Sequence, residues 1–216
     1  MLAANWPWVT LILLGAWHGC NPGMGWLFAV ALGLQKRSRN ALFAALAPIA
    51  LGHALSIGMI VGAVYVIGAV MPMRWLQIGS GTALVIIGLW KLYRSRHPNW
   101  VGMRVNSWDL TLWSWLMASA HGAGLMVLPV LLGGRSIFCG GNPPGSSSVL
   151  FIPPVVAISA VAVHTIAHLM TAAGIAWIVY DFVGLAILRR SWINLDLIWS
   201  FSLLAAGVFL FFVPSS

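Results

Sequence analysis

Acidic residues are almost absent from this 216-residue chain, which contains no glutamate and only three aspartates. Charged residues of both signs amount to 6% of the sequence, whereas hydrophobic residues amount to 61%. A soluble globule of this length needs more polar surface than that composition supplies. The sequence therefore predicts an integral membrane protein whose mass lies mostly in the bilayer.

Several enzyme signatures are also missing. The chain has no hydrolase nucleophile constellation, no phosphate-binding loop and no Cys-x-x-Cys motif, so we predict that it is not an enzyme. The two cysteines, Cys20 and Cys139, are too few for a disulfide framework. The first apolar run has neither a basic leading segment nor a small-residue cleavage site, and we expect it to be retained as a membrane span.

The net charge of +8 comes from 11 Lys and Arg residues in short connections between apolar runs. This pattern favours anionic lipid headgroups and does not form a face for nucleic acid. Three connections are basic, and those that alternate with them contain only Arg74 and Arg135. Because cationic loops stay in the cytoplasm, we expect both termini on the outer side of a bacterial inner membrane. The basic connections contain Lys36, Arg37 and Arg39; Lys91, Arg94, Arg96 and Arg104; and Arg189 and Arg190.

The number of apolar runs sets the expected architecture. An α-helix needs roughly 20 apolar residues to cross a bilayer, and the chain contains six such runs. We therefore predict an all-α polytopic membrane protein with about six transmembrane helices in one domain, 1–216. The expected spans are Trp6–Gln35, Ala41–Val70, Met73–Tyr93, Leu110–Leu132, Val155–Tyr180 and Ile193–Val213.

Five of the six histidines lie inside these spans, and glycine stands beside three of them. A protonatable side chain in hydrocarbon costs free energy unless it faces a protein interior or a water-filled path. The histidines therefore indicate a site, with His164 and His168 on one helix face because they are four residues apart. Such a pair could share a metal ion. The five residues are His18, His53, His121, His164 and His168.

Two further residues are candidate ligands. Cys20 is two residues from His18, a spacing that separates the side chains on an intact helix unless the Pro22–Gly23 break unwinds the segment. Met24 could add a thioether, although methionine in an apolar chain is more typical of packing. The histidines themselves could instead be hydrogen-bonding residues between helices whose Gly and Ala neighbours allow close contact.

The two halves of the chain, 1–104 and 105–216, carry similar motifs. Trp17-His18-Gly19 in the first span matches Ala120-His121-Gly122 in the fourth, and Gly52-His53-Ala54 in the second matches Ala167-His168-Leu169 in the fifth. Three spans in each half would make the second half enter the membrane from the opposite side. The sequence thus predicts a 3+3 inverted repeat, in which broken helices of the two halves meet at a site near the midplane.

The same motifs resemble a known group of membrane proteins. They are similar to motifs of the nickel/cobalt and urease-accessory UreH-type transporters, which are related to sulfite-exporter-like and LysE-type families. The motifs that carry the resemblance are His18-x-x-x-Pro22, the segment 27–33, Gly52-His53-Ala54-Leu55 and Ala120-His121-Gly122-Ala123-Gly124. The resemblance covers about three quarters of the chain and implies their fold. Metal-transporting members carry Asp-His where this chain has Gly23 and Met24. That departure puts nickel or cobalt in doubt and favours a softer ion such as copper.

Three functions remain open. The first is a small transporter in which the histidines line a path for a transition-metal ion (Ni, Co or Cu), held by neutral imidazoles and released on protonation. The second is an accessory, scaffold or metal-delivery subunit of a larger membrane complex, with partner subunits at the outer loop 133–154. The third is a haem b redox protein with axial histidines; it ranks last because the sequence has no quinone or electron-partner feature.

Overall fold

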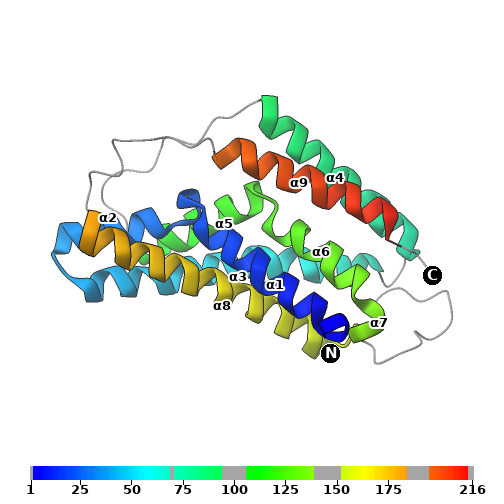
Figure 1. Ribbon diagram of the computed structural model, residues 1–216, viewed down its shortest axis with the longest axis horizontal. Coiled ribbons are helices and arrows are strands. Elements are labelled where there is room, and N and C mark those ends of the chain that lie inside the picture. Colours follow the sequence, from blue (N-terminus) through cyan, green and yellow to red (C-terminus); the bar gives the residue numbers. More distant parts are fainter. Residues whose placement is uncertain (1, 69–70, 94–105, 139–151, 184–194, 214–216) are drawn as a thin grey trace.

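The computed structural model describes residues 2–68, 71–93, 106–138, 152–183 and 195–213, and within these ranges all regular structure is helical (Figure 1). The predicted all-α class is therefore confirmed. The elements are α1 Leu2–Cys20, a 3-10 turn η1 Pro22–Met24, α2 Trp26–Lys36, α3 Arg39–Gly68, α4 Met73–Tyr93, α5 Ser107–Ala120, α6 Ala123–Gly133, α7 Arg135–Phe138, α8 Pro154–Ile178, a π-helical turn η2 Val179–Val183, and α9 Leu195–Phe212.

Three helices are long and apolar enough to cross a membrane: α3, α4 and the continuous segment formed by α8 and η2. The pair α5 and α6 makes a fourth candidate, bent by 56°. Helix α2 and the Leu197–Phe212 part of α9 are apolar but shorter. Length and composition in the described ranges thus support three to four spans, and the count of six stays a prediction.

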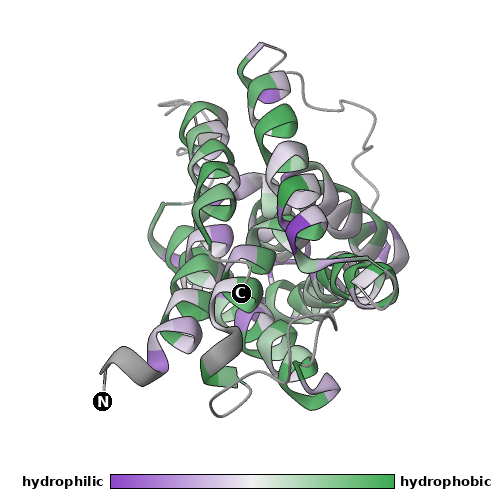
Figure 2. Cartoon of the chain, turned by 90° about the vertical axis from the view of Figure 1, so that its right-hand side faces the viewer, coloured by the Kyte–Doolittle hydropathy of each residue, from purple (hydrophilic) through white to green (hydrophobic). Residues whose placement is uncertain are grey.

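The outer surfaces of the helices are apolar. Figure 2 shows hydrophobic residues over most of the helical surface, and side chains such as Val66, Trp75 and Ile158 are more than half exposed. Water would not tolerate so large an apolar surface on a monomer, whereas the bilayer interior does. These helices indicate an integral membrane protein in contact with lipid.

Glycines set the closest helix pairings. A Cβ atom on Gly15 or Gly19 of α1 would lie 2.3 Å or 2.5 Å from the backbone oxygen of His164 or His168 on α8, and one on Gly52 of α3 would lie 2.2 Å from the oxygen of Thr111 on α5. Only glycine permits such an approach between backbones. Helices α1 and α8 therefore pack in parallel, as do α3 and α5, and α4 pairs with α9.

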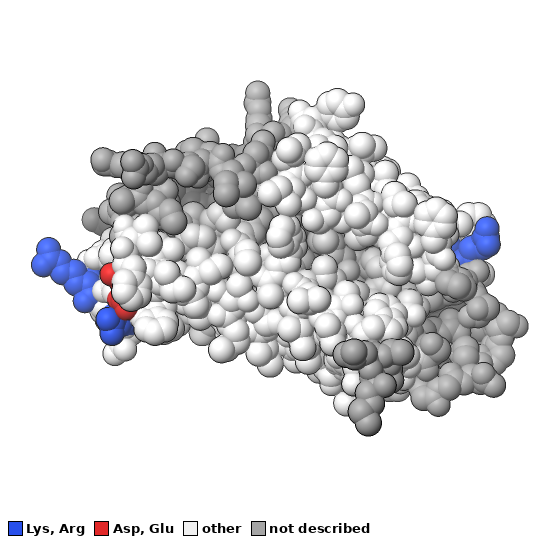
Figure 3. All heavy atoms as spheres, in the orientation of Figure 1, with Lys and Arg blue, Asp and Glu red and all other residues white. Residues whose placement is uncertain are grey.

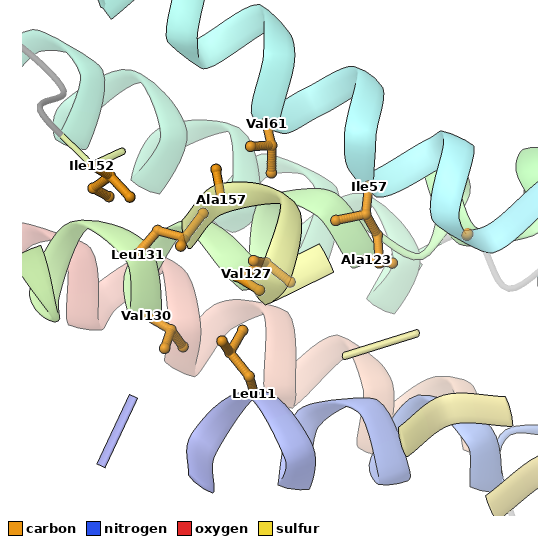
Figure 4. Packing of buried hydrophobic residues seen from close by; sticks show 11 residues of the cluster. Leu11, Ile57, Val61, Ala123, Val127, Val130, Leu131, Ile152 and Ala157 are labelled. Carbon is orange, nitrogen blue, oxygen red and sulfur yellow. The ribbon is translucent and has the colours of Figure 1, made fainter. Parts of the chain in front are cut away.

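A hydrophobic core joins the elements between these pairs. Leu11 of α1, Ile57 and Val61 of α3, Val127 of α6 and Ala157 of α8 pack together in one buried cluster (Figure 4). Because α3 and α6 belong to different halves of the sequence, this core holds the two halves together.

Figure 3 shows where charged side chains of the described residues lie on one face of the molecule. On the face drawn in Figure 3, Lys and Arg side chains are visible only at these ends among the described residues. The start of α1 and the end of α9 lie at the same end, opposite the α2–α3 turn (Figure 1). At the latter, Arg39 forms a 3.1 Å ion pair with Asp181 of η2. This arrangement suits the predicted orientation, although the other basic connections, Arg94–Arg104 and Arg189–Arg190, lie outside the described residues.

Candidate histidine site

Four of the predicted histidines meet at one place. His18 of α1, His53 of α3, and His164 and His168 of α8 are fully buried. The ring centroids of His53 and His168 are 4.0 Å apart in nearly parallel planes, and those of His18 and His164 are 4.9 Å apart at 72°. His53 also lies 5.6 Å from His18 and 5.5 Å from His164. We call these four residues the histidine cluster.

Local structure positions each ring. His53 lies halfway along the 30-residue helix α3, and His164 and His168 are one turn apart near the middle of the segment Pro154–Val183. His18 lies in the last turn of α1, where its Nδ1 atom is 2.7 Å from the carbonyl oxygen of Leu14. That oxygen is an acceptor, so Nδ1 of His18 carries the proton and Nε2 has the free lone pair.

Buried ring nitrogens in the cluster lack partners. Nε2 of His18 and both nitrogens of His53 and of His168 make no hydrogen bond within the described part of the chain. Each such buried polar atom costs about 1–3 kcal/mol. The arrangement therefore gathers several unsatisfied imidazoles at one point, where a shared cation or proton would offset that cost.

The fifth predicted histidine, His121, lies next to Trp199, which also contacts His18 of the cluster. It is buried at the junction of α5 and α6, where its Nδ1 lies 2.8 Å from the carbonyl oxygen of Met117. The indole of Trp199 on α9 lies beside it, 5.6 Å from its ring and 4.5 Å from the ring of His18. The sequence predicted one interior site from all five histidines; the structure brings His18, His53, His164 and His168 into ring contact, and Trp199 contacts the rings of both His18 and His121.

The register of α5 against α3 sets the level at which His121 lies. A Cβ on Gly52 would meet Thr111, Ser114 and Trp115, so His121 lies about two helical turns further along α5 than the level of His53. On α1, by contrast, Gly19 packs directly on the backbone of His168. His18 is consequently level with the cluster.

The two remaining candidate ligands lie apart from the cluster. Cys20 is the last residue of α1 and is exposed, so it does not share the buried face of His18. Met24 is buried in a hydrophobic cluster with Met126, Trp199 and Leu203. Cys139, His97 and loop residues 139–151 lie outside the described residues.

As packed, the rings are not arranged as a multidentate metal site. Among the described residues, no group of three or more His, Cys, Asp and Glu side chains is placed to hold a metal ion. The lone pair of an imidazole nitrogen lies in the ring plane, so the stacked rings of His53 and His168 do not aim at one point between them. Binding by more than two of these residues would require a change of side-chain rotamers, as interface side chains commonly undergo.

The cluster does not fit a haem b group either. Two axial histidines place the macrocycle between their rings. Here the rings of His53 and His168 stack directly on each other at 4.0 Å, and the pairs His18–His53, His18–His164 and His53–His164 are 4.9 to 5.6 Å apart. There is no space for a porphyrin between any of these pairs without moving the helices.

Trp199 is the site residue that sequence reasoning did not find. Its Nε1–H donates a 2.8 Å hydrogen bond to the carbonyl oxygen of His121, and its ring stacks on that of Trp17. The available signal was its place inside a predicted span, away from the ends where tryptophan usually marks the membrane interface.

Comparison of the chain with known protein families, with characterised proteins and with solved structures finds no match. The resemblance of its short motifs to the nickel/cobalt and UreH-type transporters therefore remains a hypothesis.

Proposed function

We propose that this protein is a small membrane transporter that binds or moves a transition-metal ion through the histidine cluster. The observation that carries the proposal is the meeting of four buried imidazoles from three helices with several ring nitrogens unpaired. Packing alone does not require such residues, because apolar side chains of similar volume would fill the same space at lower cost. Imidazole nitrogen is a good ligand for nickel, cobalt and copper.

The packing of the helices supports an inverted repeat as the framework for this activity. In such a repeat α1 corresponds to α5 and α3 to α8, so the observed pairs α1–α8 and α3–α5 would be exchanged by the pseudo-twofold axis. Both first helices are also interrupted, after Cys20 and after Ala120. Transporters of this build bind their substrate where broken helices meet near the midplane. We place both termini on the outer side of a bacterial inner membrane.

The resemblance to nickel/cobalt transporters supports metal transport, but two residues of their first motif differ in this chain. Those proteins carry Asp-His where this chain has Gly23 and Met24. The structure puts Met24 in an apolar cluster, so the histidines of α1, α3 and α8 would have to bind the ion by themselves.

Removing single imidazoles tests the proposal. We expect at least one of His53→Ala and His168→Ala to abolish metal binding by the purified protein and metal-dependent growth or uptake in cells, while the protein still inserts. Ser56→Ala is the matched control, because Ser56 is equally buried on α3 and bonds Ser119 of α5 at 2.9 Å. Wild-type metal content and transport in both histidine variants would refute the assignment.

A second candidate function is a non-transporting accessory subunit of a membrane complex. The observation that favours it is a groove of about 510 Å³ between α3 and α8, lined by small and apolar residues. No described atom lies within 4 Å of a Cβ built on Gly58 or Gly62 in this groove, and Gly-x-x-x-Gly faces commonly pack against other membrane helices. Gly58→Leu would then remove a copurifying partner without changing the metal content.

A further inference from the structure

We infer that the histidine cluster selects a soft monovalent cation, of the copper(I) and silver(I) class, over divalent nickel, cobalt or zinc. The inference rests on the proposed function, and it names the charge and the ligand number of the ion. Two independent features of the site lead to it: the absence of compensating charge among the described residues, and the small number of donor atoms that can converge.

The first feature is the charge balance. Of the three acidic residues, Asp109 is exposed and caps α5 by accepting the backbone N–H of Asn106, and Asp181 is paired with Arg39 at one end of the molecule. The side chain of Asp196 lies outside the described residues, and the chain contains no glutamate. Within the described ranges, the cluster thus offers only uncharged ligands to an ion.

An uncompensated ion pays a desolvation cost that grows with the square of its charge. In the low-dielectric interior a divalent ion costs about four times as much as a monovalent ion of equal radius. Sites for divalent ions usually offset this cost with carboxylates or thiolates. The histidine cluster offers neither within the described ranges, which favours a single positive charge.

The second feature is the number of donors. Nδ1 of His18 is committed to Leu14, and its Nε2 is unpartnered among the described residues. The stacked planes of His53 and His168 prevent both rings from aiming at one ion, and no group of three ligands is placed to hold a metal in the described structure. Copper(I) and silver(I) accept two nitrogen donors in a near-linear arrangement. Nickel(II) and cobalt(II) require four to six donors, often oxygen.

The test uses the full chain in lipid nanodiscs with Cys20 and Cys139 replaced by serine, because thiols bind silver and copper(I) by themselves. We would titrate silver(I), copper(I) under anaerobic reducing conditions, nickel(II), cobalt(II) and zinc(II). The expected result is at least tenfold tighter binding of the monovalent ions. That binding should weaken at least tenfold in His18→Ala and in one of His53→Ala and His168→Ala, and should be retained in Ser56→Ala. X-ray absorption of the bound ion should report two nitrogen donors.

The possible failures are distinguishable. Histidine-dependent binding that is tighter for nickel, cobalt or zinc, or a bound copper with four or more donors, would overturn the inference and leave the proposed function intact. Binding of no metal ion, or a histidine-dependent proton flux without metal, would overturn both. As a second test, His164→Asp supplies the missing negative charge and should shift the preference towards the divalent ions; an unchanged preference would contradict the charge argument.

Discussion

The two helix breaks of this protein have similar local structures but different surroundings. At each break, Nδ1 of a histidine near the end of the first helix is hydrogen-bonded to the carbonyl oxygen four residues earlier. His18 bonds the carbonyl of Leu14 in this way, and His121 bonds that of Met117. An indole N–H then bonds the last carbonyl: Trp26 bonds that of Cys20, and Trp199 that of His121.

The second helix at each break begins after a glycine with positive φ. Gly25 has φ 116° and precedes α2, and Gly122 has φ 68° and precedes α6. Side-chain-bearing residues rarely adopt these angles. Both halves of the chain therefore interrupt an apolar helix with the same local structure, a glycine of positive φ before the second helix.

The surroundings differ because the partner helices are offset. Gly19, next to His18, packs on the backbone of His168, whereas the level of Gly52 on α3 corresponds to Ser114 on α5, well before His121. His18 is consequently level with the histidine cluster, whereas His121 lies further along α5. Similar sequence motifs give the two breaks similar backbone structures. The register against the neighbouring helix decides the level at which each histidine lies.

The largest effect is expected when the α1–α8 contact is opened. In Gly19→Leu the new side chain would collide with the His168 carbonyl, 2.5 Å from its Cβ. We expect a loss of stability of about 3 kcal/mol or more, with loss of metal binding as His18 moves away. Thermal unfolding in detergent measures it.

The control for that variant is Gly174→Leu on α8, where no described atom lies within 4 Å of the added Cβ. It should change stability by less than about 0.5 kcal/mol. If Gly19→Leu were as stable as this control, the close approach of α1 and α8 would be wrong.

A smaller effect is expected at the second break. Trp199→Phe removes the donor to the His121 carbonyl but keeps an aromatic ring beside both His18 and His121. An unsatisfied buried carbonyl costs about 1–3 kcal/mol, and the melting temperature should fall accordingly. Trp199→Tyr would not restore the bond unless its hydroxyl reached the same oxygen.

The equivalent change at the first break should cost less. The bond from Trp26 to the Cys20 carbonyl is longer, 3.3 Å against 2.8 Å, and is only partly buried. We expect Trp26→Phe to lower stability by less than about 1 kcal/mol. An equal or larger loss than in Trp199→Phe would show that the two breaks do not differ in the way their environments suggest.

The smallest effect concerns ion binding. His121→Ala should change the affinity by no more than a factor of about three, or roughly 0.6 kcal/mol, because its Nδ1 is bonded to the Met117 carbonyl and its ring contacts that of Trp199. His18→Ala should lower the affinity at least about tenfold, or roughly 1.4 kcal/mol. Equal losses in isothermal titration would place His121 in the binding site after all.

Composition and motif reasoning correctly predicted the helical class and the interruption of the first apolar run near Pro22–Gly23, where α1 ends at Cys20. It also singled out all four residues of the cluster. These features are local. An apolar run, a proline or a glycine affects the structure of its own segment, and a polar side chain in an apolar run needs a polar partner or a protein interior.

The grouping within the site was predicted only in part. Trp199 was not considered, because pairing motifs by similarity carries no information on how far one helix slides along another. Here Gly52 against Thr111 and the 2.7 Å bond from Ser114 to the Ile49 carbonyl hold that register.

The sequence by itself determined the environment of this protein and which polar residues are buried. A content of 61% hydrophobic residues favours a bilayer environment, and the five histidines in apolar runs were expected in the protein interior. Tertiary structure alone decided that α1, α3 and α8 bring His18, His53, His164 and His168 together while α9 inserts Trp199 beside His121. The physical reason is that hydropathy and helix propensity act along the chain. Contact between helices depends instead on which glycines allow backbones to approach, and that is a property of pairs of segments far apart in sequence.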